Sequence, residues 1–113
     1  MGTRVVLVSV RGVIGDIVRD ALYEREVDVV ADLHDGAQLD AMLTRVAADC
    51  VVWRTEHGDL TVMQVLAHHP RLKILALEHD GKRAFLHEMS PRRVALGELS
   101  PALLAEVVEA AGR

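Results

Sequence analysis

The sequence contains a single cysteine, Cys50, which lies inside an apolar run. One cysteine cannot form a disulfide within the chain, so we expect a buried thiol in a reducing compartment. The opening residues, MGTRVVLVSV, hold too short an apolar stretch for a signal peptide or a membrane-spanning helix. The single cysteine and the short apolar stretch at the start of the sequence predict a cytoplasmic location and no association with a membrane.

Aromatic residues and excess positive charge are also scarce. Tyr23, Trp53 and Phe85 are the only aromatic residues, the basic residues are scattered, and the formal net charge is −4. Proteins that bind nucleic acid usually present a basic surface, often with aromatic side chains on which bases stack. The composition therefore disfavours direct binding of DNA or RNA.

Four apolar runs alternate with amphipathic helical patterns. The runs are rich in β-branched residues and show no polar alternation, which is typical of parallel strands covered on both faces; they span residues 4–10, 27–33, 50–53 and 72–77. Helical patterns follow the first three runs. Half of the 113 residues are hydrophobic and no linker or repeat interrupts the pattern, so we expect a single α/β domain over 1–113 with a doubly wound, mainly parallel sheet.

The first helical pattern carries one apolar stripe that we expect to face the core: Val13, Ile14, Ile17, Val18, Ala21 and Leu22. The last third of the chain differs. Asp80-Gly81 is a turn signal between two apolar runs, which predicts an antiparallel hairpin near the C-terminal edge of the sheet. A closing helix over 100–112 has Ser100 as its cap and Pro101 in its first turn.

The order strand, helix, strand, helix, strand ending in Arg54, followed by HPRLKILAL and LSPALLAEVVEAA, resembles the receiver domain of bacterial response regulators over nearly the whole chain. The resemblance implies a flavodoxin-like sheet of order 2-1-3-4-5. Receivers carry an acidic pair after the first strand, a phosphoacceptor Asp, a Thr or Ser and a Lys. Those positions fall here on Ser9 and Val10, Arg54, Glu78 and Gly97, and none keeps the family's residue.

Phosphoryl transfer needs carboxylates that hold Mg²⁺ and a carboxylate nucleophile. Val10 cannot ligate a metal and Arg54 cannot attack phosphorus, so the resemblance implies a degenerate receiver that is not phosphorylated. In a 2-1-3-4-5 sheet, Arg54 and Glu78 would end neighbouring strands and could form an ion pair that holds the loops in one state, or could remain two solvated side chains.

Two further hypotheses, a dinucleotide site and a metal site, concern the residues that follow the strands. Gly12, Gly15 and the later Asp32 match part of a dinucleotide-binding fingerprint, although the two glycines could equally serve the turn and the packing of the helix. His34, His57 and His79 each follow a strand, but their spacing matches no zinc motif, so we expect no metal. No nucleophile–base arrangement is present, which predicts neither catalysis nor a cofactor.

The sequence therefore favours a non-phosphorylatable protein-interaction module in bacterial signalling or gene regulation, which docks to another protein or to itself as a homodimer. We expect the docking face around the last strand and helix, where several apolar residues could form an exposed patch: Phe85, Leu86, Met89, Leu96 and Leu99. The alternative is a module that binds a small molecule or nucleotide at the strand ends.

Overall fold

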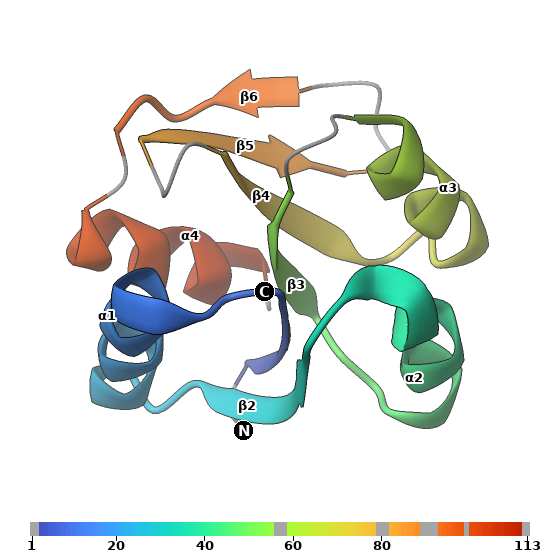
Figure 1. Ribbon diagram of the computed structural model, residues 1–113, viewed down its shortest axis with the longest axis horizontal. Helices are drawn as coiled ribbons and strands as arrows, with labels where there is room; N and C mark the ends of the chain where they lie inside the picture. The colour runs from blue at the N-terminus through green and yellow to red at the C-terminus, as the bar shows by residue number, and fades with distance from the viewer. Residues whose placement is uncertain (1–2, 56–58, 79–81, 89–92, 99, 112–113) are drawn as a thin grey trace.

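The computed structural model describes residues 3–55, 59–78, 82–88, 93–98 and 100–111. The chain has an α/β fold, as the sequence predicts (Figure 1). The strands are β1 (Arg4–Val8), β2 (Asp28–Leu33), β3 (Cys50–Arg54), β4 (Lys73–Glu78), β5 (Arg83–His87) and β6 (Arg93–Ala95). The helices are α1 (Gly12–Glu24), α2 (Leu39–Arg45), α3 (Asp59–His68) and α4 (Pro101–Ala111), with a 3₁₀ turn, η1 (Gly36–Gln38), before α2.

Within the described residues the sheet has six strands in the order β2-β1-β3-β4-β5-β6. The first four in that order pair in parallel, whereas β4 with β5 and β5 with β6 are antiparallel. The antiparallel segment expected near the C-terminal edge is therefore present, and β6, which the sequence did not identify as a strand, forms the edge. The Asp80-Gly81 turn lies outside the described residues.

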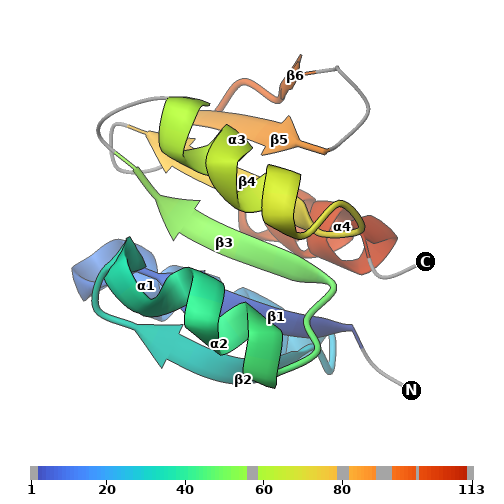
Figure 2. The same ribbon diagram turned by 90° about the vertical axis from the view of Figure 1, so that its right-hand side faces the viewer.

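Helices cover both faces of the sheet. Helices α1 and α4 lie on one face, and α2 and α3 lie on the other (Figure 1 and Figure 2). Each face has its own apolar cluster: Leu7, Val52 and Leu75 meet α1 and α4, while Val6, Val51 and Ile74 meet α2 and α3. The uninterrupted apolar runs thus supply alternate residues to both clusters, as strands buried on two faces require.

Cys50 belongs to the cluster under α1 and α4 and is fully buried. Burial raises the pKa of its thiol to about 12, because the charged thiolate loses its solvation. No helix among the described residues has both the length and the apolar character needed to cross a lipid bilayer.

Two helix starts have side-chain caps, and the sequence correctly predicts the one at Ser100. The Ser100 hydroxyl accepts a hydrogen bond of 3.1 Å from the backbone N–H of Leu103 at the start of α4. The Asp35 carboxylate accepts one of 2.9 Å from Ala37 at the start of η1. Both bonds satisfy backbone donors that a helix leaves without an internal partner, which is how N-cap residues stabilise helices.

The apolar stripe of α1 is only partly buried, which corrects the expectation from the sequence. Val18 and Leu22 are fully buried, but Val13 is 76% exposed and Ile17 is 42% exposed. The helix is rotated so that Gly15, which is buried, faces the sheet where its backbone meets the Val10 carbonyl. That rotation turns one side of the stripe outward.

Candidate functional site

An open pocket of about 420 Å³ lies at the carboxyl edge of the sheet. It is lined by Arg11, Gly12, Val13, Ile14, Ile17 and Arg54, which come from the β1–α1 connection, the first turns of α1 and the end of β3. Strands β1 and β3 are paired neighbours, with Val8 beside Trp53, so the residues that follow them meet at one edge. This is the edge at which open α/β sheets bind their ligands.

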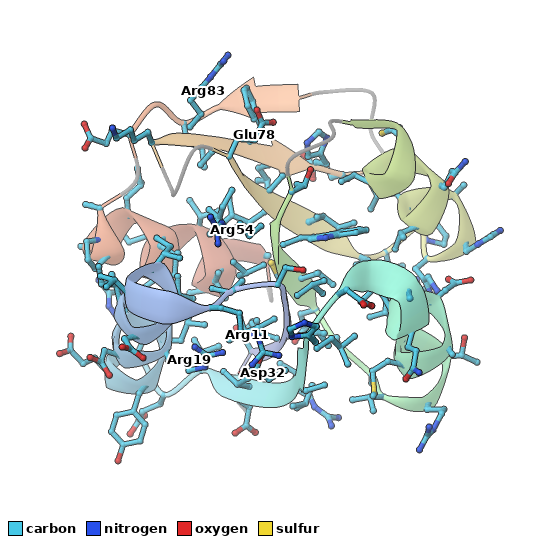
Figure 3. All side chains as sticks on the ribbon, viewed as in Figure 1. Arg11, Arg19, Asp32, Arg54, Glu78 and Arg83 are labelled. Atoms are coloured by element: carbon cyan, nitrogen blue, oxygen red, sulfur yellow. The ribbon has the colours of Figure 1, made fainter. Side chains whose placement is uncertain are left out.

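Arg54 faces the α1 side of the sheet. Its partner across β3 and β4 is Leu77, and paired residues on neighbouring strands lie on the same face. Leu77 belongs to the cluster under α1 and α4. The half-buried Arg54 side chain is thereby directed to the α1 side (Figure 3). Arg54 and Arg11 both line the pocket.

Glu78 lies one residue beyond Leu77 and faces the α3 side. Successive residues of a strand alternate between faces, so Glu78 shares its face with Ile74 and with its β5 partner Arg83. Among the described residues, the salt bridges do not include an Arg54–Glu78 pair. Of the two alternatives that the sequence leaves open, the structure therefore does not show the ion pair, because the strand register sends the two side chains to opposite faces.

The residues after β1 offer no acidic pair. Ser9 has a φ of 59°, and its hydroxyl donates a hydrogen bond of 3.0 Å to the His34 carbonyl. Val10 is fully buried. Gly97 follows β6, which lies two strands from β4, because the antiparallel β5 occupies the place beside β4. The positions aligned with receiver phosphorylation residues are thus not gathered into one metal-binding or phosphoryl-accepting cluster.

Two of the three residues of the dinucleotide fingerprint, Gly15 and Asp32, make contacts that help to hold the fold together. Arg19 donates hydrogen bonds to the Asp32 carboxylate, one of them 3.0 Å from Nε, and another of 3.0 Å to the Val10 carbonyl. A Cβ on Gly15 would lie 2.7 Å from that same carbonyl oxygen. Gly12 lines the pocket with a φ of 69°. Gly15 and Asp32 therefore help to hold α1 on the sheet, whereas Gly12 borders the pocket.

The histidines that follow strands do not assemble a metal site in the described part of the chain. His34 is exposed, and His57 and His79 lie outside the described residues. No group of three or more His, Cys, Asp or Glu side chains there is arranged to hold a metal ion.

Of the apolar residues expected at an interface, Phe85 is only 6% exposed and stacks beneath the Arg83 guanidinium, 5.6 Å from the ring centre. Leu86 and Leu96 are half-buried, and Leu96 packs against the cluster under α1 and α4. Met89 and Leu99 lie outside the described residues. Phe85 is thus part of the interior and not an exposed residue, and β6 pairs with the edge of β5 that lies away from β4.

The exposed apolar side chains of the carboxyl edge are instead Val13 and Ile17, which the sequence assigned to the core. Arg11, which precedes them, was also not singled out. Its side chain forms no cap hydrogen bond, and the first turn of α1 contains no acidic residue. That unusual start, a cation at the positive end of a helix, is the signal from which the sequence could have identified this surface.

A second pocket, of about 400 Å³, lies beside the end of α3 and includes His68 and His69. The Asp40 carboxylate of α2 contacts both, at 3.3 Å from His68 Nδ1 and 2.6 Å from His69 Nε2. The hydrogen bond from His69 lowers the pKa of Asp40 below its ordinary value. These contacts join the start of α2 to the end of α3, on the face opposite to the Arg11–Arg54 pocket.

Comparisons with models of protein families, with curated proteins and with solved structures found no match to this chain.

Proposed function

We propose that this protein is a receiver-like module of flavodoxin-like topology that is not phosphorylated and binds protein partners through the carboxyl edge of its sheet. It acts in the cytoplasm, in bacterial signalling or gene regulation. One observation carries the proposal: Arg54, at the position of a receiver's phosphoacceptor, lines an open pocket together with Arg11 and the exposed Val13 and Ile17.

The chemistry of the pocket supports binding and not phosphoryl transfer. A receiver needs carboxylates at this edge to hold Mg²⁺ and to attack phosphorus. Arg11 and Arg54 contribute positive charge instead, and Val13 and Ile17 add apolar surface beside it. Such a combination suits a partner that presents carboxylates next to apolar side chains, since complementary charge guides association and apolar burial stabilises the complex.

A small anionic ligand or nucleotide is the second candidate, because two arginines border a pocket at the edge where α/β folds bind ligands. Against a dinucleotide, Asp32 is held by Arg19, and Gly15 packs so closely on Val10 that an added Cβ would lie 2.7 Å from the Val10 carbonyl oxygen. A thermal-shift screen of nucleotides, metals and metabolites separates the two candidates. The proposal expects no saturable rise in melting temperature, and the alternative requires one.

Protein binding itself is tested by capture from a lysate of the source cell, with the immobilised wild type compared with Arg11→Glu. The control is Arg45→Glu, which reverses a charge on the exposed end of α2, away from the pocket. We expect a defined set of proteins, which includes this chain if it self-associates, to be lost with Arg11→Glu and kept with Arg45→Glu. Equal capture by all three proteins would contradict the proposal.

A further inference from the structure

The pocket of about 400 Å³ beside the end of α3 lies at the amino edge of the sheet, where the parallel strands begin. Its walls come from Leu43 of α2 and from the segments that lead into β3 and β4, residues 47–48 and 68–72. Strands β3 and β4 are parallel, with Cys50 beside Lys73, so both segments enter the sheet side by side. The pocket is therefore separate from the carboxyl edge.

The floor of this pocket is apolar and continuous with the core. Leu72 is 4% exposed and belongs to the cluster under α2 and α3, against which Leu43 and Ala48 pack. Ala47 and Pro70 add apolar surface that is open to solvent. Pockets that bind small molecules have volumes of this order and are lined mainly by apolar side chains, with a few polar groups at fixed positions. The floor thus suits the apolar part of a small molecule.

The polar groups of the pocket are Arg71 and the two histidines that contact Asp40. None of the described lining residues is acidic. Asp40 lies outside the lining and contacts His68 and His69, and within the described part of the chain Arg71 takes part in no salt bridge. The Arg71 guanidinium is therefore available to an anion from outside the protein, and its planar fork matches the two oxygens of a carboxylate.

A tight turn holds Arg71 in place. The Leu72 backbone N–H donates a hydrogen bond of 3.0 Å to the His69 carbonyl, which closes a turn with Pro70 and Arg71 at its centre. Proline favours the second position of such a turn because its ring fixes φ. The backbone that carries the guanidinium is thus positioned before a ligand arrives, which lowers the entropic cost of binding.

The charges around the pocket favour an anion over a cation. The other charged residues in and beside the lining segments are Asp40, Arg45, Asp49 and Lys73. With Arg71 they make three cations against two anions. Asp40 is engaged by the histidines, and the Asp49 carboxylate accepts a hydrogen bond of 2.9 Å from the backbone N–H at the start of β1. Neither carboxylate lines the pocket.

We infer that this pocket binds a small carboxylate with an apolar chain, of the class of medium-chain fatty acids. The carboxylate lies against Arg71, and the chain lies on Leu43, Ala48 and Leu72. One guanidinium matches a single negative charge, whereas the apolar floor disfavours a ligand that is charged or polar throughout. The inference does not depend on the proposed function, because the two pockets share no lining residue.

Titration of the ¹⁵N-labelled full chain with octanoate, followed by two-dimensional NMR, tests the inference. We expect saturable shifts centred on the amides of residues 43–48 and 68–72, with a dissociation constant of about 1 mM or tighter. Hexanoate should bind more weakly, by roughly two- to fourfold for each methylene removed, because less apolar surface is buried. Octylamine, whose charge has the opposite sign, should show no saturable binding.

Variants separate this pocket from the carboxyl edge. Arg71→Gln should weaken octanoate binding at least about 10-fold, because the charged hydrogen bonds are lost. Ala47→Glu, at an exposed lining residue, should do the same by repelling the carboxylate. Arg11→Gln, at the carboxyl edge, is the matched control and should bind octanoate like the wild type. Circular dichroism checks that each variant is folded.

Shifts that do not saturate, shifts centred on the carboxyl edge, or equal affinity of Arg71→Gln and the wild type would each overturn the inference. A rise in melting temperature caused by octanoate at this pocket is lost with Arg71→Gln and kept with Arg11→Gln, which distinguishes it from a ligand at the carboxyl edge. Protein capture that depends on Arg11 tests the proposed function separately.

Discussion

Arg54 and Glu78 end neighbouring parallel strands but point to opposite faces of the sheet. Arg54 is in register with Leu77, so Glu78 lies one residue further along β4 and on the other face. This relationship places Arg54 beside the pocket on the α1 side and Glu78 on the face that α3 covers.

The first prediction concerns this pair. Because the two side chains lie on opposite faces, a double-mutant cycle of Arg54→Ala and Glu78→Ala should give an interaction energy of no more than about 0.5 kcal/mol. The free energy of unfolding in urea provides the measurement. A matched cycle of Arg19→Ala and Asp32→Ala, whose side chains are hydrogen-bonded, should exceed that value. Coupling of Arg54 to Glu78 as strong as in the control cycle would contradict the assigned register.

Gly15→Ala should destabilise the protein by about 1–3 kcal/mol, since the new Cβ would lie 2.7 Å from the Val10 carbonyl oxygen and force α1 away from β1. In an uncrowded helix the same change would stabilise, because alanine favours helix by about 1 kcal/mol over glycine. Chemical denaturation therefore tests the close approach of Gly15 to Val10. A lower free energy of unfolding for Gly15→Ala would support it, and a higher one would contradict it. Asp20→Ala, on the exposed side of the same helix, is the control for helix propensity.

The Cys50 thiol should resist alkylation in the folded protein. With the pKa raised to about 12 by burial, only about one thiol in ten thousand is ionised at pH 8, and the side chain has no solvent exposure. Iodoacetamide followed by mass spectrometry should modify the protein in denaturant and leave it unmodified without denaturant. Rapid modification of the folded protein would show that Cys50 is accessible.

Acid should weaken the junction between α2 and α3. The pKa of Asp40 is lowered below 3.8, chiefly by the hydrogen bond from His69. A carboxyl group with a lower pKa in the folded state stabilises the protein above its unfolded pKa and loses that contribution as the pH falls through the folded pKa. The difference in stability between the wild type and Asp40→Asn should therefore shrink as the pH drops from about 5 to about 2. A difference that does not change over this range would contradict the assignment.

Some parts of the fold could be predicted from the sequence because a single local pattern determines them. The apolar runs of β1, β3 and β4 indicate strands buried on both faces, and Ser100 marks the start of α4. The rotation of α1 could not be predicted. Its apolar residues span a wide arc, and which part is buried depends on the close approach of Gly15 to Val10.

The site was harder to predict because it depends on register. Strand ends suggest which residues share an edge, but the side of the sheet that Arg54 faces follows from its pairing with Leu77. The outer edge of β5 pairs with β6, a three-residue strand that is too short to give a periodic signal. Both are long-range features, so local patterns carry little information about them.

The central claim, that the carboxyl edge is a binding surface and not a phosphorylation switch, is tested most directly by incubating the protein with a small phosphodonor and Mg²⁺ and weighing it intact by mass spectrometry. We predict an unchanged mass, because Arg54 stands where the resemblance to receivers would place the phosphoacceptor, and neither Ser9 nor Val10 supplies a carboxylate for a metal. A stoichiometric, hydroxylamine-labile phosphoryl adduct would contradict the claim.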